Sequence, residues 1–123
     1  MPLDIYIQGR ESRSVLSLED GPLYWFLHPY LLSIKDDTGQ YLDLYGNCAF
    51  SFSQLPVLRA MIGKIESSCA NSPSSLSVSV GTKDGQAILK EINKTDLVNF
   101  LRAFKAVLND AESMNAGLVC RGD

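Results

Sequence analysis

Acid–base, nucleophilic or metal chemistry in this sequence would have to use very few side chains. The only histidine is His28, and the three cysteines are Cys48, Cys69 and Cys120. A thiol near His28 would make a nucleophilic dyad, and the four side chains together would suit zinc. Structural zinc sites usually take ligands in close pairs, whereas these cysteines lie 21 and 51 residues apart. The spacing favours a packed histidine and small, buried, reduced thiols, so we expect no catalytic residue, no metal and no cofactor.

A phosphate-binding loop is the second kind of site that the sequence superficially offers. Residues 81–85, GTKDG, contain the glycine, threonine and lysine of such a loop. They lack the order GxxxxGK(S/T), and they lead into an apparent strand, so no helix N-terminal amides would face a phosphate. A hairpin turn is the better interpretation.

The densest chemistry lies in residues 21–50, which hold the only tryptophan, the only histidine and four of the five tyrosines. Three carboxylates, Asp36, Asp37 and Asp43, accompany them. These would suit a divalent cation, a solvated turn or a protein-binding surface, although the spacing is not that of an EF-hand. Tyrosine rings supply contact area, and carboxylates pair with basic groups of a partner. The residues that we expect to bind a partner are Glu19, Asp20, Asp36, Asp37, Tyr41, Asp43 and Tyr45.

The elements that must position these residues follow from the apolar pattern. Strands are predicted at residues 3–8, 15–18, 41–45, 76–80, 87–92 and 118–120. Apolar steps of three and four predict long amphipathic helices at residues 55–69 and 95–112, and a continuous apolar run predicts a buried helix at 23–34, irregular near Pro29. Residues 36–39 have turn chemistry. The order is β-β-α-β-α-β-β-α-β, an α+β domain spanning residues 1–123, with the two long amphipathic helices packed on one face of a mainly antiparallel sheet.

Composition and charge restrict the class of partner. The 123 residues carry a net charge of −3, with 46% hydrophobic and 20% charged residues, which is typical of one folded domain. Residues 1–50 sum to −4 and the remainder to +1. An acidic half disfavours nucleic acid and anionic membranes and favours a basic partner. The N-terminus lacks a signal-peptide pattern and no window is long enough to span a bilayer, so we expect a cytoplasmic protein.

In size, acidity, α+β pattern and lack of catalytic residues, the chain resembles small bacterial immunity proteins of toxin–immunity systems. The resemblance extends over the whole chain and rests on general type, because no diagnostic motif is present. It implies a non-enzymatic protein that inhibits a cognate toxin, often a basic nuclease, by covering its active site or an exosite.

Two other function classes fit the same sequence. An interaction subunit or adaptor of a bacterial assembly would use the apolar run from Leu23 to Leu32 as a permanent interface. An exposed apolar patch of that size is unusual on a monomer. A small enzyme would depend on Cys48 or His28. We expect the binding module that neutralises a partner, with the adaptor as the alternative.

Overall fold

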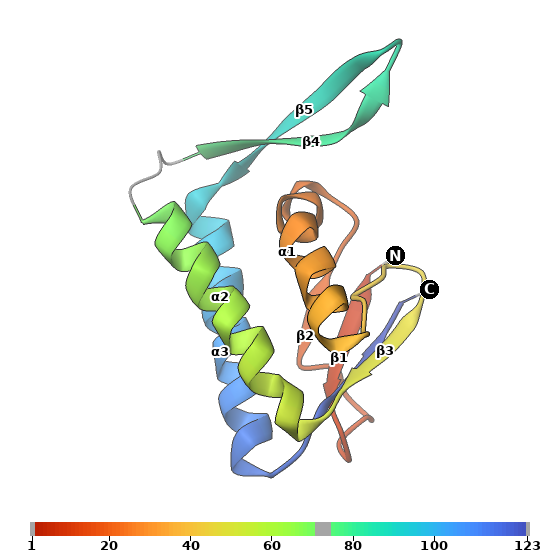
Figure 1. The fold of residues 1–123 in the computed structure, drawn as a ribbon, viewed down its shortest axis with the longest axis vertical. Coiled ribbons are helices and arrows are strands. Elements are labelled where there is room, and N and C mark those ends of the chain that lie inside the picture. Colours follow the sequence, from red (N-terminus) through yellow and green to blue (C-terminus); the bar gives the residue numbers. More distant parts are fainter. Residues whose placement is uncertain (1, 71–74, 123) are drawn as a thin grey trace.

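The computed structural model describes residues 2–70 and 75–122. The elements, shown in Figure 1, are β1 (Leu3–Ile7), β2 (Leu16–Leu18), α1 (Pro22–Thr38), β3 (Asn47–Phe50), the short 3₁₀ helix η1 (Phe52–Gln54), α2 (Leu55–Cys69), β4 (Ser75–Lys83), β5 (Gln86–Asn93), α3 (Lys94–Ser113) and β6 (Leu118–Arg121). The α+β class is confirmed, and η1 is an addition to the expected order.

Four strands form an antiparallel sheet in the order β2-β1-β6-β3. The alternation in β1 has the predicted effect, because Leu3, Ile5 and Ile7 are buried while Asp4 and Tyr6 are partly exposed. Leu118 and Cys120 of β6 are buried in the same way. The sheet therefore turns one apolar face towards the core, as a strand period of two requires.

The predicted amphipathic helices α2 and α3 pack against each other along their apolar stripes (Figure 1). Leu58 and Ile62 of α2 and Leu97 and Leu108 of α3 are completely buried. Each large side chain of this kind contributes roughly 1.5–3 kcal/mol of favourable transfer free energy before chain entropy is counted. Helix α1, which was predicted as a buried helix at residues 23–34, contacts α2 and is a third long helix beside the two that were expected to be long.

Two expectations about the strands were wrong. Strands β4 and β5 form a separate two-stranded sheet instead of joining the main one. Residues 41–45 are a loop, and the third strand lies at residues 47–50. Leu42 and Leu44 are buried as an alternating pattern predicts, but the Asp43 carboxylate accepts the Tyr45 N–H at 3.0 Å and closes a turn there.

Helix α1 is longer than predicted, because it continues through Pro29 and includes the residues that were expected to form a turn. Its end is at Gly39, which has φ 77° and donates its N–H to the Lys35 carbonyl. A glycine with positive φ is the usual C-terminal stop of a helix. Asp36 and Asp37 therefore lie on the last helical turn and not in a solvated loop.

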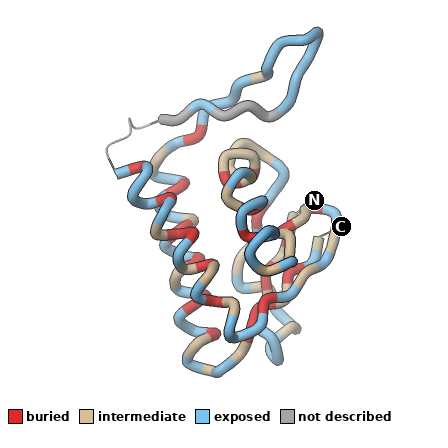
Figure 2. Tube along the Cα trace, in the orientation of Figure 1, coloured by how far each residue is buried: buried red, intermediate tan, exposed pale blue. Residues whose placement is uncertain are grey.

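The hairpin of β4 and β5 projects beyond the helices, and its described residues are mostly exposed (Figures 1 and 2). Asp84 and Gly85 both have positive φ, of 54° and 79°, which confirms the predicted Asp-Gly hairpin turn. Among the hairpin side chains whose burial the structure describes, Ile92 at the base of β5 is buried in the core, whereas Leu89 is 63% exposed. Contacts with α1 and α3 hold this hairpin to the body of the protein.

Candidate protein-interaction surface

Helix α1 is apolar on its outward side as well as on its core side. Tyr24, Leu27, Leu31 and Ile34 are buried, as one stripe of a packed helix must be. Further apolar side chains surround this stripe and are half-buried or exposed, and Leu32 is 43% exposed. We call these residues the α1 surface: Trp25, Phe26, Pro29, Tyr30 and Leu32. A surface helix normally turns polar residues outward, so the α1 surface is a candidate interface.

The loop of residues 41–46 is fastened to α1 by a hydrogen-bonded cluster of aromatic residues. The buried Tyr24 hydroxyl donates to the Leu42 carbonyl at 2.9 Å and lies 3.2 Å from the Tyr41 hydroxyl. The Tyr41 hydroxyl is also 2.9 Å from Nε2 of His28. Burial, followed by the hydrogen bond with Tyr41, raises the pKa of Tyr24 above its ordinary value. Tyr24 therefore stays neutral and acts as a structural donor.

Asp20 links the start of α1 to the same loop. Its carboxylate accepts the indole N–H of Trp25 at 3.0 Å and the hydroxyl of Tyr45 at 3.5 Å. Tyr45 is 67% exposed, so most of its ring is free to contact another molecule. Asp43 holds the backbone of Tyr45 in place by accepting its N–H. The structure thus brings together four of the predicted residues, Asp20, Tyr41, Asp43 and Tyr45.

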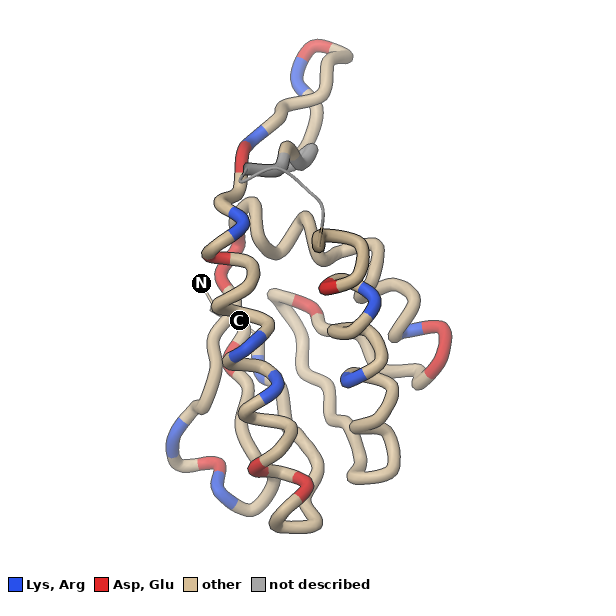
Figure 3. Tube along the Cα trace, turned by 90° about the vertical axis from the view of Figure 1, so that its left-hand side faces the viewer, with Lys and Arg blue, Asp and Glu red and all other residues tan. Residues whose placement is uncertain are grey.

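The other acidic residues lie at the two ends of α1. Glu19 is exposed beside Asp20, just before the helix, whereas Asp36 and Asp37 are exposed on its last turn. A helix of 17 residues is about 25 Å long, so the two acidic groups cannot form one cluster. Within the described residues, the salt bridges use the carboxylates of Glu11, Glu66 and Glu112 only. None of the predicted acidic residues takes part in these salt bridges, although Asp20 and Asp43 accept hydrogen bonds. Figure 3 shows how charges are spread over the fold.

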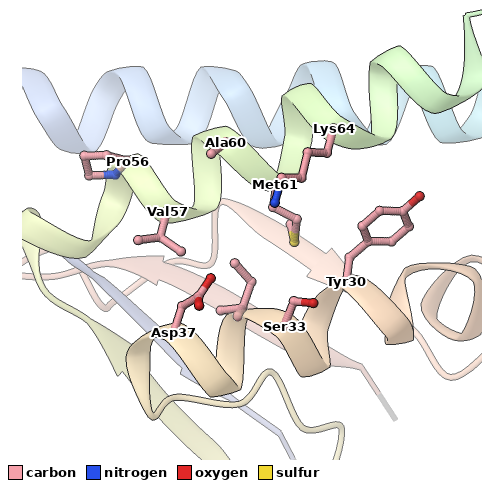
Figure 4. Close-up of a pocket in the computed structure, with 9 residues that line it drawn as sticks. Tyr30, Ser33, Asp37, Pro56, Val57, Ala60, Met61 and Lys64 are labelled. Carbon is pink, nitrogen blue, oxygen red and sulfur yellow. The ribbon is translucent and has the colours of Figure 1, made fainter.

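A groove between α1 and α2 borders the α1 surface (Figure 4). Its volume is about 330 Å³. Its lining includes Tyr30, Ile34 and Asp37 of α1 and Val57 and Met61 of α2. In Figure 4 the side chains of Val57 and Met61 point towards α1. These residues of α1 lie roughly 80–180° around the helix from Tyr24 and His28, at about 100° per residue. The exposed side of α1 therefore has the groove on one side and the loop of residues 41–46, here called the Tyr45 loop, on the other.

Sequence reasoning missed several parts of this surface. Trp25 and His28 were not among the residues expected to bind a partner, but Trp25 bonds to Asp20 and His28 bonds to Tyr41 of the loop. The groove residues Val57 and Met61 were not singled out at all. The sequence did contain one sign of an apolar surface on this helix. The apolar run of residues 23–34 is too continuous for a helix with a single buried stripe.

The structure does not bring His28 and the cysteines together as a nucleophilic dyad or a metal site. His28 bonds to Tyr41, while Cys48 of β3 lies opposite Cys120 of β6. In residues 2–70 and 75–122, no three histidine, cysteine or acidic side chains are grouped so that they could hold a metal ion. The helices in these ranges are also too short or too polar to cross a membrane. Exposed rings and carboxylates held in place by hydrogen bonds suit recognition of another molecule.

The chain matches no protein-family model, no curated protein and no solved structure. The residues of the α1 surface and the acidic groups around it are therefore the features from which a function can be inferred.

Proposed function

We propose that the chain is a non-catalytic protein-binding module that neutralises a basic partner protein through the α1 surface. One observation carries this proposal: the outward side of α1 is apolar and has carboxylates at both of its ends. Protein interfaces have this plan, with an apolar centre that excludes water and a polar rim. The residues that contribute the rim are Glu19, Asp20, Asp36, Asp37 and Asp43, with Tyr41 and Tyr45 beside them.

Helix α1, with acidic groups at both of its ends, is about as long as an interface of standard size is wide. The helix is about 25 Å long, and a standard interface buries about 800 Å² on each partner, which is a patch roughly 25–30 Å across. Trp25, Tyr30 and Tyr45 are the kinds of residue that dominate binding energy at such centres. Two of them are already held in place, because Asp20 accepts hydrogen bonds from both Trp25 and Tyr45. Little side-chain entropy would be lost when they bind.

The position of Asp36 and Asp37 supports a role in binding. The C-terminal end of a helix carries a partial negative charge, so each carboxylate there costs about 0.3–1 kcal/mol of stability. Lys35 is the only basic residue in that turn. Carboxylates that destabilise their own helix are explained if they attract lysine or arginine of a partner and raise its association rate.

The class of protein that best fits this surface is the immunity protein. Such a protein acts in the cytoplasm of the cell that makes it, needs no catalytic residue, cofactor or metal, and covers a cognate toxin. The net charge of −4 in residues 1–50 suits a basic toxin domain, and it disfavours nucleic acid and anionic lipid as ligands.

The proposal is tested by capturing the partner with matched variants. The purified chain serves as bait for a lysate of its source cell and for the products of neighbouring genes, at low and at high salt. Leu32→Asp places a charge on the α1 surface, where the side chain is 43% exposed, and Val98→Asp is the control on α3, where the side chain is 38% exposed. We expect Leu32→Asp to abolish salt-sensitive capture of one basic, toxic protein, and Val98→Asp to retain it. Equal capture by both variants contradicts the proposed surface.

The alternative function is an interaction subunit of a larger assembly, which the apolar α1 surface also favours. In that case the surface is covered permanently, and the isolated chain self-associates or captures a housekeeping complex whatever the salt concentration. Sedimentation of the isolated chain separates the two functions. A monomer in dilute solution favours the immunity protein, whereas concentration-dependent association that Leu32→Asp removes favours the subunit.

A further inference from the structure

Two cysteines that are far apart in the sequence face each other in the main sheet. Cys48 of β3 and Cys120 of β6 are direct partners in the antiparallel register. Directly opposed residues of antiparallel strands point to the same face of the sheet. Phe50 and Leu118, two residues along each strand, are buried. Both thiols therefore point to the core side of the sheet.

The backbone places these two cysteines within reach of a covalent bond. The N–H of Gly122 donates to the Gly46 carbonyl at 2.8 Å, and hydrogen-bonded pairs recur every second residue along an antiparallel ladder. Cys48 and Cys120 therefore occupy a hydrogen-bonded pair, with Cα atoms about 5.5 Å apart. Disulfides form between Cα atoms about 4.4–6.8 Å apart.

The two thiols have unequal environments. Cys48 is half-buried, while Cys120 is completely buried. The hydrogen bond from Cys120 lowers the pKa of Cys48, and the same bond together with burial raises the pKa of Cys120. Cys48 is thus the thiol that solvent reaches and that ionises first. Reaction with an oxidant starts at the thiolate, so it starts at Cys48.

We propose that Cys48 and Cys120 form a site of reversible oxidation, which a hydroperoxide converts into a cross-strand disulfide. In the first step the Cys48 sulfur attacks one peroxide oxygen. An S–O bond forms, the O–O bond breaks, and the leaving oxygen departs as an alcohol or water with the thiol proton. In the second step the Cys120 sulfur attacks the sulfenic sulfur of Cys48. The S–S bond forms, the S–O bond breaks, and the hydroxyl leaves as water with the proton of Cys120.

The crosslink would fasten the Tyr45 loop to the last strand. Residue 46 ends that loop and already bonds to Gly122. A side chain at Gly122 would place its Cβ 2.4 Å from the Leu44 carbonyl oxygen, so loop and strand are in tight contact. The disulfide would lie two residues along each strand from the hydrogen bond between Gly46 and Gly122. This oxidation site stands on the β3–β6 geometry alone and does not depend on the proposed partner.

The test uses the reduced wild-type chain and hydrogen peroxide. After brief treatment, free thiols are alkylated and the peptides are mapped by mass spectrometry. We expect one dominant Cys48–Cys120 disulfide, which dithiothreitol reverses, and a rise of several degrees in the thermal midpoint of the oxidised chain. The comparison is the same chain in urea. There the 21-residue loop between Cys48 and Cys69 is favoured about sixfold over the 72-residue loop between Cys48 and Cys120.

The proposal therefore requires the folded chain to form the Cys48–Cys120 disulfide, although the unfolded chain favours Cys48–Cys69. A folded chain that forms Cys48–Cys69, that leaves Cys48 as a sulfinic acid without a crosslink, or that reacts more slowly than the unfolded chain would overturn the proposal. A second measurement uses Cys120→Ala with dimedone, which traps sulfenic acids. We expect trapping on Cys48 and little on Cys69, which is buried in α2. Labelling of Cys69 in preference to Cys48 would also count against the site.

Discussion

Reversing the charge of Asp36 and Asp37 should strengthen the fold while it weakens binding. Both residues are exposed on the last turn of α1, which Gly39 closes. In the described part of the chain neither makes a salt bridge, so no ion pair is lost. Each Asp→Lys change replaces a repulsion of about 0.3–1 kcal/mol by an attraction of similar size. After allowance for screening at these exposed positions, the double variant should gain about 1–2 kcal/mol, or roughly 4–8 °C in its thermal midpoint.

The assay is urea unfolding at low and high salt, followed by partner association by stopped flow. We expect the stability gain to shrink at high salt, since exposed charges are screened beyond about 10 Å at 0.1 M. The association rate should fall for the same variant. Glu19→Lys is the matched control, because Glu19 is exposed at the opposite end of α1, where a carboxylate is favourable. It should lower stability slightly and also slow association. Loss of stability in the Asp36 and Asp37 variant would refute the argument from the helix terminus.

Other predictions concern the core and the aromatic cluster. Phe104→Ala removes a buried ring of α3 that packs edge-to-face on Phe100. The free energy of unfolding, measured in urea, should fall by about 2–5 kcal/mol. Normal stability of this variant would contradict the packing. Tyr24→Phe leaves the Leu42 carbonyl without its 2.9 Å donor and should cost about 1–3 kcal/mol. The folded-state pKa of Tyr24 is raised above the ordinary value of 10.0. Its contribution to stability is therefore complete below pH 10 and declines above it. The decline should be smaller in Tyr24→Phe, and equal slopes in alkaline unfolding titrations would count against the buried hydroxyl.

Local pattern predicted the regular elements well where one face of an element is buried. The period of two in Leu3, Ile5 and Ile7 and the helical spacing of Leu55, Leu58 and further residues both correspond to buried faces. The Asp84-Gly85 turn was also readable, since its backbone needs positive φ. In these places the nearest neighbours in sequence determine the structure.

The same reasoning failed where one residue pattern fits two structures. Asp-Asp-Thr-Gly at residues 36–39 suits a turn and a helix C-terminus equally, because both use glycine with positive φ. Alternating burial at Leu42 and Leu44 suits a strand, but strands need a neighbouring backbone for their hydrogen bonds. Here the Leu42 carbonyl accepts a hydrogen bond from the Tyr24 hydroxyl and not from a neighbouring strand. In the second case a contact with a residue distant in the sequence decided the structure.

By itself, the sequence determined the acidic first half, the aromatic run and the amphipathic faces, because these depend only on residue types and their spacing. Tertiary structure decided which of those residues share a surface. It brought Tyr45 to Asp20 across 25 positions of sequence and left Asp36 a helix length away from Asp20. It also paired Cys48 with Cys120. Such pairings arise from chain segments that meet through packing of the core, and no local pattern encodes where a loop returns.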